Sequence, residues 1–188
     1  MESLFKIDSA ILFFFNISIR NPALDFLMPI ITDAGTLFPV GLIAGLVSVS
    51  FAREQRLYYT FSFLVSMYLS QIASHQLKIF FNRPRPAITL DWVNVIGPYL
   101  YDRSFPSGHT TIAFAMGIFF SMKFPRFKAF FISLAVLVAI SRMYLGVHYP
   151  SDVIAGALTG STVAFLSVTA VDRLAMFRKK PADGVNQS

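Results

Sequence analysis

The sequence lacks cysteine altogether, which excludes a disulfide framework, a thiolate metal site and a cysteine nucleophile. It is also poor in charge: Asp, Glu, Lys and Arg make up 14% of the chain, against roughly 25% in an average soluble domain. Apolar residues are abundant instead, with 55% hydrophobic residues, 21 phenylalanines and a mean hydropathy of +0.60. This composition excludes a disordered chain, a coiled coil and an ordinary cytosolic domain, and it predicts a polytopic membrane protein.

The hydrophobic segments predict an all-α membrane bundle of about five transmembrane helices in one domain, residues 1–188. Each crossing needs ~20 residues. The expected spans lie within residues 22–52, 57–81, 107–122, 129–145 and 151–174. Residues 7–20 are apolar but reach only about 21 Å as a helix, against a hydrocarbon core of about 30 Å. Because Ser9, Asn16 and Arg20 fall on one helical face, we expect this segment to be an interfacial helix. A six-span alternative has residues 4–20 crossing the membrane.

The net charge of +6 indicates membrane topology and attraction to anionic lipid or phosphate, not nucleic acid. Nine basic residues lie in the 53–56 turn, the 123–128 turn and the region after residue 171: Arg53, Arg56, Lys123, Arg126, Lys128, Arg173, Arg178, Lys179 and Lys180. By the positive-inside rule these turns are cytoplasmic. The long 82–106 loop then faces outward, and we expect its 87–105 segment to select the substrate.

Three blocks of polar residues stand at predicted helix ends on that outer face. Lys78 is followed by Arg85-Pro86, then comes Pro106-Ser107-Gly108-His109, and last Ser141-Arg142 with His148 and Asp152. The three cations Lys78, Arg85 and Arg142 would repel one another unless an anion lay among them. Ser107 and Gly108 begin a helix, where free N–H groups bind anions. The predicted ligand is a tetrahedral oxyanion, most plausibly phosphate.

Two histidines on different segments, His109 and His148, supply what phosphoryl transfer needs: a nucleophile and an acid for the leaving oxygen. Asp152 follows His148 by one helical turn and can hold one ring nitrogen as the donor. This face shows neither a carboxylate cluster nor a His/Cys set with metal-ligand spacing. We therefore expect no metal and no cofactor, with the cations taking the metal's place.

Several of these residues also have a purely structural interpretation. The Arg83–Pro86 run is compatible with a solvated basic turn, and His148 with Asp152 is compatible with a structural pair. His75 is best interpreted as a core histidine with its hydrogen bonds satisfied. Asp102 and Arg103 are expected to pair with each other or to touch a headgroup. The co-occurrence of all three blocks, in order and on one face, favours the catalytic interpretation.

The three blocks resemble the signature of the type 2 phosphatidic acid phosphatase superfamily, over roughly residues 22–176. The resemblance implies His148 as nucleophile, Asp152 as the residue that orients it, and His109 as general acid. It implies five phosphate ligands: Lys78, Arg85, Ser107, Gly108 and Arg142. It also implies a metal-independent reaction through a phosphohistidine, and a compact bacterial enzyme of the inner membrane whose site faces the periplasm or outside.

The resemblance implies a lipid phosphate drawn from the bilayer as substrate. Lipid A 1-phosphate and phosphatidylglycerophosphate are favoured, and undecaprenyl pyrophosphate and phosphatidic acid are possible. Undecaprenyl pyrophosphate phosphatases of this superfamily can carry Asp where Gly108 stands, which leans away from that subgroup. Two alternatives stay open: a non-catalytic membrane protein that binds or carries anionic lipid, and a phosphatase of a soluble phosphate ester.

Overall fold

The structure is a computed structural model that describes residues 2–36 and 56–179, and every regular element in these two ranges is helical. The elements are α1 (Glu2–Phe13), the π-helical turn η1 (Phe14–Ser18), α2 (Pro22–Thr36), α4 (Arg56–Phe81), α5 (Pro86–Thr89), α6 (Gly108–Lys123), the 3₁₀ turn η3 (Pro125–Phe127), α7 (Lys128–Tyr144) and α8 (Pro150–Lys179). The all-α prediction is therefore confirmed for the described residues.

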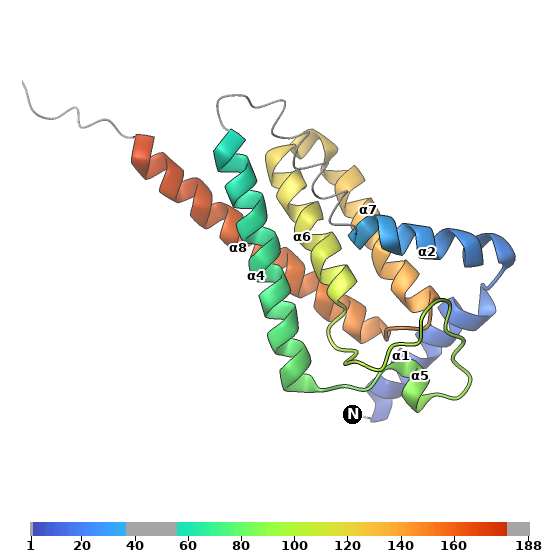
Figure 1. The fold of residues 1–188 in the computed structure, drawn as a ribbon. Helices are drawn as coiled ribbons and strands as arrows, with labels where there is room; N and C mark the ends of the chain where they lie inside the picture. Colours follow the sequence, from blue (N-terminus) through green and yellow to red (C-terminus); the bar gives the residue numbers. More distant parts are fainter. Residues whose placement is uncertain (1, 37–55, 180–188) are drawn as a thin grey trace, which may run out of the picture.

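Helix α6 is the centre of the bundle, since it packs against α4, α7 and α8 (Figure 1). Its contact with α8 is unusually close. A Cβ on Gly160 would lie 2.0 Å from the carbonyl oxygen of Thr111, and one on Gly156 would lie 2.7 Å from that of Ser107. Glycine at these two positions therefore allows the backbones of α6 and α8 to approach each other at the ends where the site forms.

The N-terminal segment makes two helices with a sharp bend between them. The axes of residues Ser3–Ser18 and Pro22–Asp33 differ by 117°. Asn21 ends the first part and caps the second, because its side-chain oxygen accepts a hydrogen bond from the Leu24 N–H at 3.0 Å. Helix α1 lies across the end of the bundle, where it contacts α8, whereas α2 packs across α7 (Figure 1).

The prediction that Asn16 belongs to the polar face of an interfacial helix is wrong. Asn16 is fully buried. Its amide donates to the carbonyl oxygens of Asn94 at 2.8 Å and Tyr144 at 2.7 Å, and its own oxygen accepts from the Asn94 N–H at 2.9 Å. The polar side chain therefore fastens η1 to the protein instead of facing lipid headgroups.

Two described helices are long and apolar enough to cross a membrane, Pro125–Tyr144 and Pro150–Leu174, and the bent N-terminal pair would add a third if it is one broken span. These two correspond to the predicted fourth and fifth spans. Helix α4 has 26 residues but carries the serines 62, 66, 70 and 74 along one face, and α6 has only 16 residues. The predicted first span lies partly outside the described residues, so the count of five stays a prediction.

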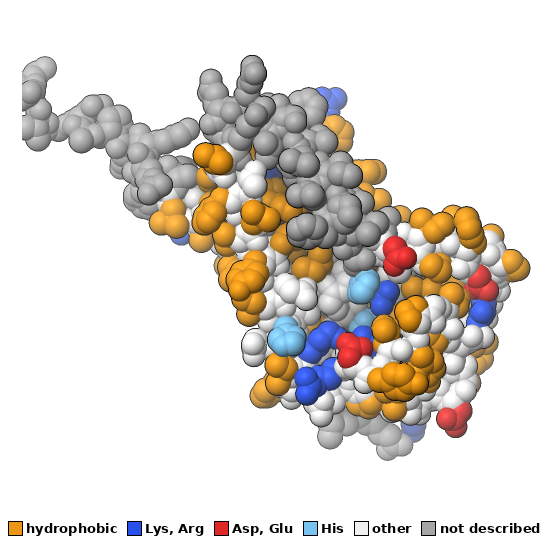
Figure 2. Space-filling view, viewed as in Figure 1, with side chains coloured by type: hydrophobic (Ala, Val, Ile, Leu, Met, Phe, Trp, Pro, Cys, Tyr) orange, Lys and Arg blue, Asp and Glu red, His pale blue; other side chains and the backbone are white. Residues whose placement is uncertain are grey.

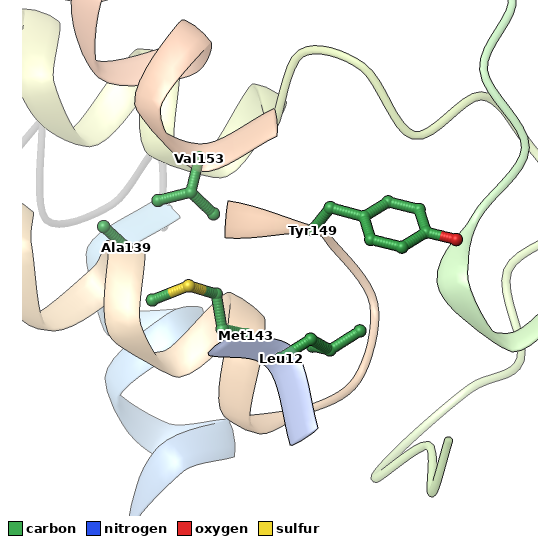
Figure 3. Close-up of a cluster of buried hydrophobic side chains, with 5 residues drawn as sticks. All are labelled: Leu12, Ala139, Met143, Tyr149 and Val153. Atoms are coloured by element: carbon green, nitrogen blue, oxygen red, sulfur yellow. The ribbon is translucent and has the colours of Figure 1, made fainter. Parts of the chain in front are cut away.

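A small apolar cluster joins α1, α7 and α8 directly beneath the site. Leu12, Ala139, Met143 and Val153 converge there, while the ring of Tyr149 extends away from them toward the loop that holds α5 (Figure 3). The Tyr149 hydroxyl is hydrogen bonded with the Thr89 hydroxyl in α5. This packing fixes the short connection between α7 and α8, which carries His148.

Candidate active site

The site forms where the described helices end, and the first turn of α6 is docked on the first turn of α8. The Ser107 N–H donates to the Asp152 carbonyl oxygen at 3.0 Å. As predicted, Ser107 caps α6, its hydroxyl accepting from the Thr110 N–H at 3.5 Å. These contacts place the second and third predicted motifs beside each other.

The connection from α7 to α8 turns sharply at Gly146, whose φ is +73°. A Cβ there would lie 2.9 Å from the Asn16 amide nitrogen and 2.9 Å from Val93. Both the left-handed backbone and the crowding favour glycine. Every residue from 141 to 150 is buried, so His148 is surrounded by packed protein on this side of the site.

Two of the three predicted cations are buried side chains. Arg85 and Arg142 are each 5% exposed, and Lys78 is partly buried. Arg85 donates from Nη1 to the Val147 carbonyl oxygen at 2.8 Å, and the same nitrogen lies 3.2 Å from His148 Nε2. Buried cations gathered in this way need an anion to offset their mutual repulsion.

Arg142 is held from the N-terminal half of the chain. Its Nη1 donates to the Thr32 hydroxyl of α2 at 2.8 Å, while its buried Nε makes no hydrogen bond within the described residues. A buried guanidinium N–H without an acceptor costs free energy unless a ligand supplies one. Thr32 had no signal in the sequence that linked it to the site.

The predicted pair of His148 and Asp152 is present. Both are buried, and Asp152 Oδ2 lies 3.5 Å from His148 Nδ1. Asp152 Oδ2 also accepts from the Tyr149 N–H at 2.9 Å and from the Ser104 hydroxyl. The carboxylate therefore faces Nδ1, and the opposite ring nitrogen, Nε2, points to Arg85 and the cationic side of the site.

Burial lowers the pKa of the His148 imidazole to about 3, and the positive charge of Arg85 adds to the decrease although contact with Asp152 opposes it. His148 is thus neutral at physiological pH, with Asp152 placed to accept from Nδ1–H and a lone pair left on Nε2. A neutral ring with a free lone pair is the form that a nucleophile requires.

His109 lies in the first turn of α6, partly buried, and the charges that act on it most are those of Arg142, His148, Arg85 and Lys78. All eight predicted site residues are therefore brought together at one end of the bundle. Within the described residues, groups of three or more His, Cys, Asp or Glu side chains that could hold a metal ion are absent.

Three residues behave differently from their sequence interpretation. His75 is not a core residue: it is exposed and lines a cavity of about 510 Å³ next to Lys78. Asp102 does not pair with Arg103. Its carboxylate accepts from Arg85 Nε at 2.8 Å and lies 3.7 Å from Lys78 Nζ, whereas Arg103 donates to Asn82 at 2.7 Å.

Asp102 belongs to the long loop, and its carboxylate lies between the cations Arg85 and Lys78. Burial alone would raise its pKa, but Arg85 and Lys78 outweigh that effect and hold the pKa of Asp102 below its usual range. Arg83 is not a solvated turn residue either, because it forms ion pairs with Asp8 and Asp152. These contacts connect residues far apart in the sequence, so spacing alone could not reveal them.

Figure 2 shows this end of the molecule as a gathering of Lys, Arg and His side chains with an acidic side chain among them, bordered by hydrophobic surface. The cavity is lined by His75, Lys78, Asn82, Arg83, Pro84, Ile88, Tyr101, Asp102 and Arg103. It opens beside the cations that the sequence predicts to bind phosphate, and its volume would accommodate a group larger than phosphate.

Comparison with known proteins places these features in a family. The family model described as "PAP2 superfamily" matches residues 59–175. The lipid A 1-phosphatase of Rhizobium johnstonii is 40% identical over 81 residues, which is 43% of this chain and 33% of the relative. The matched region thus spans about a third of that relative's length.

Two solved structures share the fold over most of the chain. The crystal structure of Aquifex aeolicus LpxE matches with a TM-score of 0.75 and 31% identity, covering 87% of this chain and 95% of that one. A transmembrane PAP2-type phosphatidylglycerolphosphate phosphatase from Bacillus subtilis matches with a TM-score of 0.74 and 28% identity, covering 93% and 88%. Since the family match includes all three motifs and more than half of the residues, the chain belongs to the PAP2 superfamily.

Proposed function

We propose that this protein is an integral membrane phosphatase that hydrolyses a lipid phosphate through a phosphohistidine. The observation that carries the proposal is the buried His148, with Asp152 behind Nδ1 and Arg85 at 3.2 Å from Nε2. One ring nitrogen, Nδ1, lies against a carboxylate, and the other, Nε2, points to a cluster of cations. This is the arrangement that in-line attack on a phosphate requires.

In the first half-reaction, the Nε2 lone pair of His148 attacks phosphorus and forms the P–N bond. The P–O bond to the lipid breaks, and the electron pair leaves with the lipid oxygen. His109 donates a proton to that oxygen, so the product is a lipid alcohol, or a lipid monophosphate if the substrate is a diphosphate. Asp152 stabilises the positive charge that develops on the His148 ring.

In the second half-reaction, water attacks the phosphorus and gives a proton to His109. The P–N bond breaks, its electron pair returns to His148 Nε2, and inorganic phosphate leaves. His109 thus acts as acid and then as base, which returns both histidines to their starting states.

Five groups are proposed to hold the phosphate: the side chains of Lys78, Arg85, Ser107 and Arg142, and the backbone at Gly108 at the start of α6. Arginine forks donate paired hydrogen bonds to phosphate oxygens, and a helix start offers free N–H groups. Charge accumulates on those oxygens in the transition state, so fixed cations lower the barrier without a metal ion.

Because cations and histidines make up the proposed site, phosphate release should continue in the presence of EDTA, and vanadate should inhibit it as a pentavalent phosphate mimic.

The substrate is proposed to enter from the bilayer, because the site lies at the ends of apolar helices. Lipid A 1-phosphate and phosphatidylglycerophosphate are the favoured headgroups, in line with the names of the R. johnstonii and B. subtilis proteins. Undecaprenyl pyrophosphate and phosphatidic acid are further candidates. We also propose that the protein resides in a bacterial cytoplasmic membrane as a single domain with the site facing outward.

The test is phosphate release by the purified protein in detergent from these four lipids and from glucose 6-phosphate. We expect release from at least one lipid phosphate, loss of that release in His148→Ala, and little activity on the sugar phosphate. Absence of release from all four lipids would refute the proposal, and so would an equally active His148→Ala variant.

A further inference from the structure

Arg83 lies two residues before the phosphate ligand Arg85 but points to the opposite side of the catalytic pair. Its Nη1 donates to Asp152 Oδ1 at 2.8 Å and to the Ser151 hydroxyl at 2.6 Å. Its guanidinium carbon lies 3.9 Å from the centroid of the Tyr149 ring. Arg83 therefore contacts the carboxylate that faces His148, and it also contacts Tyr149 and Ser151, the residues on either side of Pro150.

The two oxygens of Asp152 have separate partners. Oδ2 faces His148 Nδ1, whereas Oδ1 is paired with Arg83. Asp152 is fully buried, and a buried carboxylate is costly unless a cation or several donors compensate it. Arg83 supplies that cation, and because it holds Oδ1 it also sets the rotation of the carboxylate that aims Oδ2 at the ring.

Arg83 is itself held by Asp8 in helix α1. Its Nη2 donates to Asp8 Oδ2 at 2.8 Å, and Asp8, 3% exposed, also accepts from the Ser151 N–H at 2.9 Å and from the Ser151 hydroxyl. Asp8 thus fixes the arginine and the first turn of α8 together. Helix α1, which the sequence predicts to lie at the membrane surface, is therefore connected to the Asp152 carboxylate through the side chain of Arg83.

We infer that Arg83 and Asp8 are positioning residues for the His148–Asp152 pair, and that α1 is a working part of the active site. This inference rests on the proposed function. Asp8 orients Arg83, Arg83 orients and neutralises Asp152, and Asp152 orients His148. Arg83 lines the neighbouring cavity, but neither residue is one of the five proposed phosphate ligands, so both should influence the rate of attack and leave phosphate binding unchanged.

The competing explanation is that the Asp8–Arg83 pair merely attaches α1 to the bundle. In that case its loss would lower thermal stability and yield, while kcat per folded molecule would be unchanged. A positioning role predicts a loss in kcat with little change in KM, because the carboxylate no longer orients the nucleophile. Loss of such an outer-shell partner typically costs about 10–100-fold in metal sites, and a similar range is expected here.

The experiment measures kcat, KM and inhibition by inorganic phosphate in detergent micelles, with the lipid phosphate that wild type hydrolyses fastest. Arg83→Gln should lower kcat about 10–100-fold while KM and the phosphate inhibition constant stay within about twofold. Arg83→Lys keeps the charge and should recover part of the loss. Arg20→Gln is the matched control, since Arg20 pairs with Asp25 at 3.2 Å in the same N-terminal segment, and it should behave as wild type.

Asp8→Asn is nearly isosteric and serves if Arg83→Gln does not fold. It should reduce kcat by a smaller factor at unchanged KM. The double variant is the decisive arm: because Asp8 acts on Asp152 through Arg83, adding Asp8→Asn to Arg83→Gln should cause a smaller loss of kcat than Asp8→Asn causes in the wild-type protein. Independent, multiplying losses, or variants with wild-type kcat, would overturn the inference. An inactive wild-type protein would instead refute the proposed function.

Discussion

Arg142 combines two features that make it sensitive to substitution: it is buried, and its Nε has no hydrogen-bond acceptor within the described residues. One side of its guanidinium is held by Thr32. The remaining N–H groups are therefore available to a phosphate, and the planar fork fixes their direction.

Arg142→Lys keeps the charge but loses the fork, so we expect kcat/KM to fall by about 10²–10³, the loss typical of one transition-state donor. Steady-state kinetics in detergent measure it. Arg126→Lys, in an exposed turn at the other end of the bundle, should be unaffected. Near-native turnover by Arg142→Lys would remove Arg142 from the phosphate site.

His148 gives a prediction that depends on pH. Its folded-state pKa is lowered to about 3, mainly by burial. Between that value and its unfolded value near 6.5 the unfolded chain binds more protons, so this residue makes stability decrease as pH falls through that window, by at most about 1.4 kcal/mol per pH unit. In the NMR spectrum of ring-labelled histidines, the His148 signal should stay that of a neutral ring down to pH 5. A midpoint near 6.5 would contradict the buried, neutral nucleophile.

The eight predicted site residues could be named from the sequence because each motif has a fixed spacing and stands at a helix end, and their roles stay predictions. Arg83 and Asp8 were missed as a pair because they are separated by 75 positions, and Thr32 because it is 110 positions from Arg142. His75 was assigned to a core because a histidine within an apolar run gives no sign of which side of the helix faces a cavity. Contacts of this kind depend on how the helices are arranged in space.

At the scale of whole elements, the close packing of α6 on α8 determines where the two motif-bearing helix starts meet. Gly160→Ala would place a Cβ 2.0 Å from the Thr111 carbonyl oxygen, so the helices must separate. Overpacking of this kind typically costs about 1–3 kcal/mol. We expect a lower midpoint of thermal unfolding in detergent and reduced kcat.

Gly117→Ala is the graded comparison for that variant, since its Cβ would lie 3.3 Å from the Phe131 carbonyl oxygen. Gly117 faces α7, whereas Gly156 and Gly160 lie at the contact between α6 and α8. It should therefore have a smaller effect on stability and little effect on kcat. Equal effects of the two substitutions would show that the α6–α8 contact does not determine the site.

The helix ends were predicted closely where prolines, basic turns and apolar runs mark them. Helix α4 begins at Arg56 where Leu57 was expected, and α7 runs from Lys128 to Tyr144 where 129–145 was expected. The burial of Asp8 and Asn16 was not predicted. Asn16 donates to the carbonyl oxygens of Asn94 and Tyr144, and Asp8 accepts from Arg83, contacts that a helical wheel cannot show.

For the molecule as a whole, the site and the basic turn at residues 123–128 lie at opposite ends of the bundle. Helix α6 starts at the site and ends at Lys123, close to the start of α7 (Figure 1). Lys123 pairs there with Asp172 of α8 at 2.6 Å and lies 5.1 Å from the Tyr58 ring centroid. The separation of the two ends is the arrangement that the positive-inside rule requires for an outward-facing site.

The absence of cysteine makes this orientation easy to test with single-cysteine variants. Asp91→Cys, exposed in the long loop, should react with a membrane-impermeant maleimide in intact cells. Arg126→Cys, in the basic turn, should react only after permeabilisation. The reverse pattern would place the site on the cytoplasmic side.

The most direct test of the central claim is to trap the covalent intermediate during turnover of a lipid labelled at its phosphorus. We predict label on the peptide that contains His148, stable in base and labile in acid, and absent in His148→Ala. Asp152→Asn should form it more slowly, because the ring loses the partner that orients it. Label on Ser107, or no trapped label together with inversion at a chiral phosphate, would show that His148 is not the nucleophile.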